Sequence, residues 1–219
     1  MNRRTALTLV ASTAIAFVLT GCTSNTSSFR FRMTVVVETP EGPKTGSSVY
    51  AVGAGNKVKL TSEEGTRFLW DRGEAVAVEL PGGKTLFALL KTGAHFEDMA
   101  TLSMETLDPH FTERYDTVGT AARIAGREGV TSPVAVDPAI YPMLVTFEDI
   151  NDPTSVELVD PDDLAATFGE GTALKRITVQ ITDDPVTTGI EERLGWLDNY
   201  YDKMLDGSSI NNSSALANL

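Results

Sequence analysis

Phe-Arg-Phe-Arg-Met-Thr-Val-Val-Val, at residues 29–37, alternates apolar and polar side chains over most of its length. Successive side chains of a β-strand point to opposite faces, so a period of two predicts a strand with one buried face and one solvated face. Arg30, Arg32 and Thr34 share the second face. We interpret that face as solvated; contact of the two arginines with an anion or a partner protein is the alternative.

Two turn sequences divide the next part of the chain into hairpins. Pro-Glu-Gly-Pro at residues 40–43 predicts a turn, after which residues 47–52 return as the partner strand. Pro-Gly-Gly-Lys at residues 81–84 joins strand-like runs at 74–80 and 85–91, because proline presets φ at one turn position and glycine accepts positive φ at the next. Both runs are apolar on consecutive residues, which predicts that this pair lies in the middle of a sheet.

Periodicity and capping residues predict the remaining elements. Strands are expected at 141–147, 155–159 and 173–182, and helices at 96–107, 160–169 and about 188–205, with a further short one around 121–124. Asp160 would cap the helix at 160–169, and Gly169 would end it. The last helix would bury a stripe formed by Ile190, Leu194, Leu197, Tyr201 and Met204. We therefore predict an α+β fold, a single domain over residues 29–206 with a largely antiparallel β-sheet and about three helices.

The first 28 residues have a different character. Met1-Asn2-Arg3-Arg4 precedes an uncharged run from Thr5 to Ser28, in which residues 6–19 are mostly apolar. A positive start before an apolar stretch of about fourteen residues is typical of a secretory signal. As a helix that stretch would be roughly 20 Å long, short of the ~30 Å of a bilayer's hydrocarbon core. The pattern therefore favours a removable leader over a transmembrane helix.

Leu19-Thr20-Gly21-Cys22 ends this leader and resembles the lipobox of bacterial lipoprotein precursors. The resemblance implies that residues 1–21 are a signal peptide and that the Cys22 thiol carries a diacylglyceryl group, with Cys22 as the new first residue. An ordinary signal peptide with an incidental cysteine, or a buried free thiol, is the alternative. In proteobacterial lipoproteins an Asp after the cysteine favours retention in the inner membrane. Thr23 at that position implies the outer membrane, with the protein facing the periplasm.

From Phe29 to Leu197 the chain is also similar to a group of uncharacterised proteobacterial envelope proteins. The segments that carry this similarity are residues 29–35, 72–78, 159–164 and 190–197. It implies secretion and a shared fold, and it supplies no activity. On either side of this region, composition predicts a polar tether at 22–28 and a flexible, Ser- and Asn-rich tail at 207–219.

Charge and cysteine content restrict the partners and the means of stabilisation. The 219 residues include 18 basic and 30 acidic side chains, for a formal charge of −12. Loss of the leader removes two of the basic ones and leaves −14. Such a polyanion is poorly suited to bind nucleic acid, and its membrane contact would depend on the lipid. Because Cys22 is the only cysteine, the fold must rely on its core without a disulfide.

The sequence contains no motif of a catalytic, metal or cofactor site, and we expect none. His95 and His110 have no third ligand at a standard metal spacing. Asp149-Ile150-Asn151-Asp152 begins like a calcium loop, but the residues that follow do not supply the required ligand and glycine, so we interpret it as a turn. Asp183-Asp184-Pro185 is interpreted as a polar loop. A pair of catalytic carboxylates would instead indicate a hydrolase acting on envelope polymers.

Trp196 and Tyr200 lie four residues apart, beside the apolar stripe of the expected last helix. Core packing is one interpretation, and an exposed aromatic patch that contacts an envelope protein is the other. Taken together, the sequence predicts a lipid-anchored, non-catalytic lipoprotein that acts through protein or ligand contacts. A carboxylate-dependent hydrolase and a small-ligand binder are the alternatives.

Overall fold

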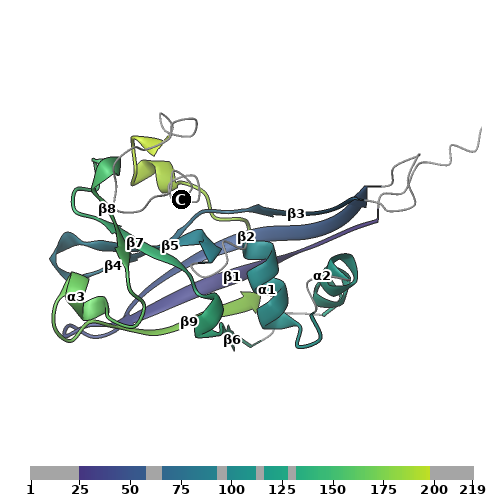
Figure 1. Ribbon diagram of the computed structural model, residues 1–219, viewed down its shortest axis with the longest axis horizontal. Helices are drawn as coiled ribbons and strands as arrows, with labels where there is room; N and C mark the ends of the chain where they lie inside the picture. The colour runs from purple at the N-terminus through teal and green to yellow at the C-terminus, as the bar shows by residue number, and fades with distance from the viewer. Residues whose placement is uncertain (1–24, 58–65, 93–97, 112–115, 128–131, 198–219) are drawn as a thin grey trace, which may run out of the picture.

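Two antiparallel sheets and three α-helices form the described part of the protein, in a computed structural model that describes residues 25–57, 66–92, 98–111, 116–127 and 132–197 (Figure 1). Every strand pairing in both sheets is antiparallel. The predicted antiparallel character is therefore confirmed, but the strands form two sheets where the sequence indicated one.

Strand β1 (Thr26–Glu38) lies at the centre of the larger sheet, whose order is β3-β2-β1-β9-β6. Its inner face is buried and consists of Phe29, Phe31, Met33 and Val35, while Arg30 on the outer face is exposed, as the alternation predicts. The other strands of this sheet are β2 (Lys44–Lys57), β3 (Thr66–Arg72), β6 (Val134–Ala135) and β9 (Ala173–Ile181). β3 and β6 are strands that the periodicity of the sequence does not predict.

The start of β1 lies further towards the N-terminus than expected. Thr26, Ser27 and Ser28 pair with residues 53–55 of β2, so these residues of the predicted tether belong to the sheet. The two small residues Gly53 and Gly55 in β2 leave room on one face for the aromatic side chains of β3. The sheet therefore extends to within a few residues of Cys22, which itself lies outside the described residues.

The smaller sheet has the order β4-β5-β7-β8. Its strands are β4 (Val76–Glu79), β5 (Thr85–Thr92), β7 (Pro142–Phe147) and β8 (Val156–Val159). The predicted hairpin of β4 and β5 is confirmed, and Gly82 and Gly83 at its turn both have positive φ, 78° and 77°. Its predicted place in the middle of a sheet is wrong for β4, which is an edge strand. β4 is buried because β2 packs across it, with Gly46 against the Ala77 carbonyl.

Each of the three α-helices begins at an aspartate. The helices are α1 (Met99–Leu107), α2 (Thr117–Ala125) and α3 (Leu164–Phe168), and the carboxylates of Asp98, Asp116 and Asp163 accept hydrogen bonds from backbone N–H groups of the first turn. The expected cap at Asp160 is therefore wrong: Asp160 accepts from the N–H of Asp162 in the preceding turn, and the helix starts three residues later. Gly169 ends α3 as predicted.

Helices α1 and α2 pack against the inner face of the larger sheet and are joined by an ion pair. The buried carboxylate of Asp108, at the end of α1, accepts from the Arg123 guanidinium of α2 at 2.9 Å and from the His110 backbone N–H at 3.0 Å. Burial by itself raises the pKa of Asp108, but these hydrogen bonds and the arginine charge hold it below its ordinary value. The ion pair therefore fixes both helices on the sheet.

The C-terminal segment differs most from its prediction. In place of an α-helix, residues 190–192 form a 3-10 turn, η4 (Ile190–Glu192), preceded by Gly189 at a φ of 114°. Ile190, Leu194 and Leu197 are nevertheless buried, in a second core cluster with Phe87 and Phe147 of the smaller sheet. The rest of the expected helix lies outside the described residues. No helix of the described part is both long and apolar enough to cross a membrane.

Candidate ligand-binding site

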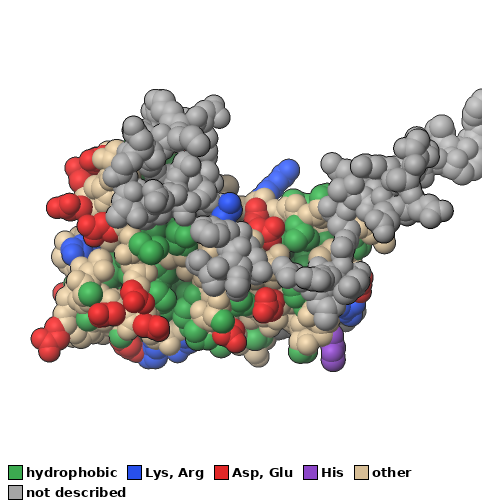
Figure 2. Space-filling view, in the orientation of Figure 1, with side chains coloured by type: hydrophobic (Ala, Val, Ile, Leu, Met, Phe, Trp, Pro, Cys, Tyr) green, Lys and Arg blue, Asp and Glu red, His purple; other side chains and the backbone are tan. Residues whose placement is uncertain are grey.

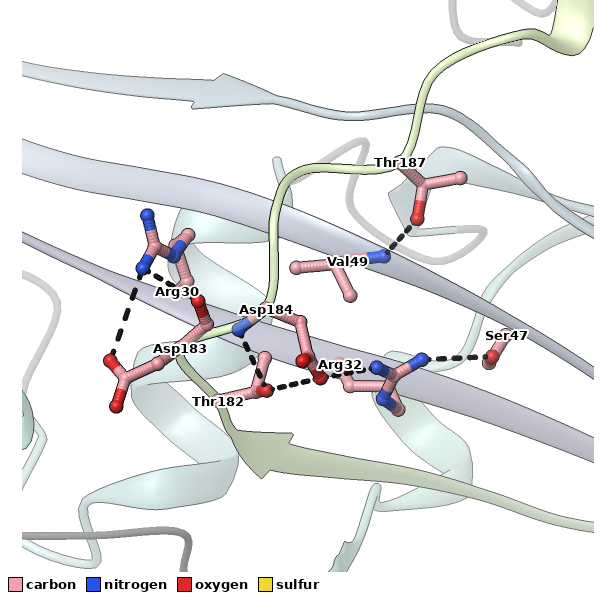
Figure 3. Close-up of polar contacts among 8 residues, drawn as sticks. All are labelled: Arg30, Arg32, Ser47, Val49, Thr182, Asp183, Asp184 and Thr187. Carbon is pink, nitrogen blue, oxygen red and sulfur yellow. Dashed lines mark hydrogen bonds and ion pairs between the residues drawn. The ribbon is translucent and has the colours of Figure 1, made fainter.

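A crossing segment at residues 182–187, called the strap here, lies over the outer face of the larger sheet (Figure 3). It leaves β9 beside β1, where the Thr182 N–H donates to the Arg30 carbonyl at 3.1 Å. It ends at β2, where the Thr187 N–H donates to the Val49 carbonyl at 3.0 Å and the Val49 N–H donates to Thr187 Oγ1 at 2.8 Å. The strap therefore spans β1, and it brings Asp183 and Asp184 over the outer face.

Both arginines that the sequence placed on this face contact the strap. Arg30 Nη2 donates to the Asp183 carbonyl at 2.8 Å and lies 3.9 Å from its carboxylate. Arg32 Nη2 is 2.5 Å from Asp184 Oδ2, and its Nη1 donates to Ser47 Oγ at 3.3 Å. Two features that the sequence analysis treated separately, the arginine face and the Asp183-Asp184 loop, are thus one polar cluster.

Asp184 is held as a carboxylate by this arrangement. The Thr182 hydroxyl donates to Asp184 Oδ2 at 2.7 Å, and this hydrogen bond, followed by the contact with Arg32, lowers the pKa of Asp184. A proton-donating catalytic acid requires the opposite shift. The cluster is therefore suited to hold the strap in place and to present charge.

A cavity of about 340 Å³ lies beside the strap. Among the described residues, its charged lining consists of two guanidinium groups, Arg30 and Arg127, and one carboxylate, Asp183. Arg127 follows α2, and its N–H donates to the Ile124 carbonyl. The remaining lining residues are Ser28, Phe29, Ala51, Trp70, Ala125, Ile181, Thr182 and Val186. The volume is within the range of small-molecule sites, roughly 300 to 1,000 Å³.

The indole of Trp70 is one wall of this cavity and depends on a glycine in the neighbouring strand. Trp70 of β3 lies opposite Gly53 of β2, and three atoms of its ring come within 2.7 Å of where a Cβ on Gly53 would lie. Phe68 covers Gly55 in the same way, two residues along. An aromatic side chain over a strand glycine is a known means of stabilising sheets, and here it presents a flat apolar surface next to two cations.

The lining is positively charged although the chain is acidic. Among the described lining residues, two arginines against one aspartate leave one net positive charge, in a chain of formal charge −12. Arg72 pairs with Ala51, which in turn pairs with Arg30, so the side chains of Arg72 and Arg30 lie on the same outer face. Arg72 is exposed there. The cavity therefore offers an anion two guanidinium groups and an aromatic wall.

The other sequence candidates lie apart from this cavity. Trp196 is half-buried: its Nε1 donates to the Ile150 carbonyl at 2.8 Å, and its ring packs edge-on against Phe147 with 5.6 Å between centroids. Tyr200, Cys22 and His95 lie outside the described residues, so the proposed aromatic patch and the lipid site stay predictions.

The histidine and the acidic loop that the sequence singled out have local roles. His110 is exposed, and its backbone N–H donates to Asp108. The carboxylates of Asp149 and Asp152 accept from N–H groups of their own loop, which agrees with the interpretation as a turn. Among the residues that the structure describes, no three His, Cys, Asp or Glu side chains gather as a metal-binding group.

Trp70 and Arg127 were not identified from the sequence. The sequence does contain a signal for Trp70. Gly53 and Gly55 are two residues apart, and so are Phe68 and Trp70, which is the spacing needed for two aromatic side chains to cover two glycines on a paired strand. No comparable signal exists for Arg127, whose position depends on how α2 packs. Comparison of the chain with protein-family models, curated proteins and solved structures finds no match.

Proposed function

We propose that the protein is a lipoprotein of the bacterial cell envelope, anchored through Cys22 to the outer membrane and facing the periplasm. In this proposal the folded part is non-catalytic and acts by binding a ligand or a partner. The sequence Leu19-Thr20-Gly21-Cys22 after an apolar leader is the observation that carries the proposal. Each buried CH₂ of an acyl chain contributes about 0.8 kcal/mol, so two or three chains give a stable anchor.

The position of β1 supports an anchor of this kind. The Asn25 carbonyl accepts from the Asn56 N–H at 3.1 Å, and β1 begins at the next residue. Three residue steps separate Cys22 from Asn25, about 11 Å of fully extended chain. A lipid on Cys22 would therefore hold the end of the sheet formed by the start of β1 and the end of β2 against the bilayer.

The distribution of acidic side chains is compatible with this orientation. On the face drawn in Figure 2, acidic groups gather over α3 and β8, at the opposite end of the molecule from the start of β1. The exposed acidic residues of β8, of the turn before α3 and of the segment after it are Glu157, Asp160, Asp162, Asp163 and Glu170. Anionic lipid repels acidic side chains, so an orientation that keeps these acidic groups away from the membrane is favoured.

The binding role is supported by the cavity between Arg30 and Arg127. A hydrolase with Asp183 and Asp184 as its acid pair is less well supported, because Arg32 and the Thr182 hydroxyl hold Asp184 as a carboxylate and lower its pKa.

Lipidation can be tested in a Gram-negative host fed an alkyne analogue of palmitate. We expect the wild-type chain to be labelled and to float with outer membranes, and globomycin to block its processing. Cys22→Ser should abolish labelling, and Thr23→Asp should keep the label while shifting the protein to the inner membrane. An unlabelled wild-type protein in the soluble fraction, with mobility unchanged by globomycin, would refute the anchor.

A further inference from the structure

We infer that the cavity between Arg30, Arg127 and Trp70 is a binding site for a small aromatic phosphate, a phosphate monoester joined to a flat ring. The inference rests on the ligand-binding part of the proposed function and specifies the site and the class of ligand. It does not require that Cys22 carry a lipid.

The charge of the site favours a phosphate. Guanidinium groups bind phosphate through paired N–H donors, and two of them match the two negative charges of a monoester. Arg127 makes no hydrogen bond or ion pair through its side chain to the described residues, and Arg30 uses one of its five N–H donors on the Asp183 carbonyl. The Thr182 hydroxyl, also in the lining, already donates to Asp184 and has acceptor capacity only.

Asp183, the one carboxylate among the described lining residues, is a weak competitor for these cations. The Asp183 side chain is 99% exposed, and its nearest oxygen is 3.9 Å from Arg30 Nη2. Exposed pairs at such distances contribute little, so an incoming phosphate can displace Asp183 from Arg30 at small cost. Because the Asp183 carboxylate would repel the phosphate, it would weaken binding. Removing its charge should therefore raise the affinity, whereas removing either arginine should lower it.

Size and shape favour a ring next to the phosphate. A volume of about 340 Å³ equals that of roughly ten water molecules at ~30 Å³ each, enough for a ligand of the size of phenyl phosphate. The Trp70 indole, supported from below by Gly53, offers that ring a flat stacking surface. Apolar contacts from Ala51, Ala125 and Val186 complete the wall.

Calorimetry on the full processed protein in non-ionic detergent tests the site. The probes are phenyl phosphate, benzamide as a neutral ring, and glycerophosphoglycerol as a soluble lipid headgroup without a ring. We expect saturable binding of phenyl phosphate that weakens with salt, and clearly weaker binding of the other two. Arg127→Gln should weaken phenyl phosphate binding about tenfold, Arg30→Gln should also weaken it, and Asp183→Asn should strengthen it.

Arg176→Gln is the matched control, because it removes the same charge from an exposed position of β9 outside the cavity. It should change the affinity less than twofold, and thermal unfolding checks that each variant is folded. The inference is overturned if phenyl phosphate does not bind, if benzamide or glycerophosphoglycerol binds equally well, or if Arg127→Gln and Arg176→Gln have equal effects. If the wild-type protein is not labelled by palmitate but binds phenyl phosphate, only the lipid anchor is refuted. If it is labelled but does not bind phenyl phosphate, only this binding site is refuted.

Discussion

Glu74 and Ile190 are 116 positions apart in the sequence, and Glu74 Oε2 accepts a 2.8 Å hydrogen bond from the Ile190 backbone N–H. Glu74 Oε1 accepts from the Gly189 N–H, also at 2.8 Å. One carboxylate thus satisfies two N–H groups at the start of η4, which has no cap from its own segment. This contact fixes the chain that follows the strap to the residues just before β4.

Replacing this carboxylate should destabilise the protein. Glu74→Gln retains one oxygen but turns an NH₂ group towards a backbone N–H, so we expect a loss of about 1–3 kcal/mol in the free energy of unfolding. Urea denaturation measures it. Glu79→Gln is the control: its side chain is 72% exposed and pairs with Arg193 at 2.8 Å, and it should cost less than about 1 kcal/mol. Equal losses for the two variants would contradict the role of Glu74.

Gly46 should not tolerate a side chain. A Cβ at this position would lie 2.1 Å from the Ala77 carbonyl oxygen, at the contact between β2 and β4. Backbone cannot move aside as a flexible side chain does, so Gly46→Ala should cost at least about 1–3 kcal/mol of stability. Gly195→Ala is the comparison, because no atom of the described residues other than its chain neighbours lies within 4 Å of its Cβ position. If both variants unfold at the same urea concentration, the two strands are not packed this closely.

The carboxyl of Asp184 should titrate at a pH below the ordinary aspartate value of about 3.9. A lowered pKa means that the strap contact is complete above that value and is lost as the pH falls through the lower, folded-state pKa. The Thr182 hydroxyl lowers this pKa by its hydrogen bond, and Arg32 lowers it by a hydrogen bond and by its charge, so Thr182→Val and Arg32→Gln should each raise it. Carbon-detected NMR of the side-chain carboxyl measures both shifts. An unchanged pKa in either variant would contradict the contact that this variant removes.

The hydroxyls of Tyr50 and the adjacent Ser48 are both buried, and neither makes a hydrogen bond of regular geometry within the described residues. Tyr50→Phe should therefore leave stability unchanged or raise it, since an unsatisfied buried group is removed. Thr146→Val is the contrast: Thr146 Oγ1 donates to the Thr85 carbonyl at 2.8 Å, and its loss should cost about 1 kcal/mol. A cost for Tyr50→Phe as large as that for Thr146→Val would mean that the Tyr50 hydroxyl is bonded after all.

Burial also raises the pKa of the Tyr50 phenol; the adjacent Ser48 hydroxyl opposes this shift, and the nearby carboxylates of Asp71 and Glu74 add to it. The stabilising effect of the neutral phenol is therefore complete below the ordinary tyrosine pKa of about 10 and is lost as the pH rises beyond it. In an ultraviolet titration, no more than four of the five tyrosines should ionise while the protein stays folded. Ionisation of all five before unfolding would contradict the burial of Tyr50.

Sequence patterns predicted the elements whose structure is determined by residues close to one another in the chain. The alternation at residues 29–37 identified the inner and outer faces of β1, because side-chain direction in a strand depends only on position. Turn residues identified the hairpin of β4 and β5, since Gly82 and Gly83 supply the positive φ that the turn requires. These features need no knowledge of the rest of the chain.

Other elements depended on contacts that no local pattern contains. Residues 190–197 have helical spacing and are buried as that spacing suggests, but Gly189 and the Glu74 carboxylate fix a 3-10 turn at their start. β4 is as apolar as a central strand although it is an edge strand, because β2 packs across it and buries it. The sequence thus predicts that an apolar segment is buried, but it does not predict which other segment of the chain covers it.

The amino-acid sequence by itself determined the two faces of β1 and the acidic character of the chain, and it predicts a lipoprotein leader over residues 1–21, before Cys22. Only the tertiary structure brought Asp183 and Asp184 across more than 150 positions onto Arg30 and Arg32, and joined Trp70 and Arg127 in one cavity. The physical reason is that side-chain alternation is a property of a single strand. A binding cavity, in contrast, depends on strand register and helix packing, which the hydrophobic core of the whole chain selects together.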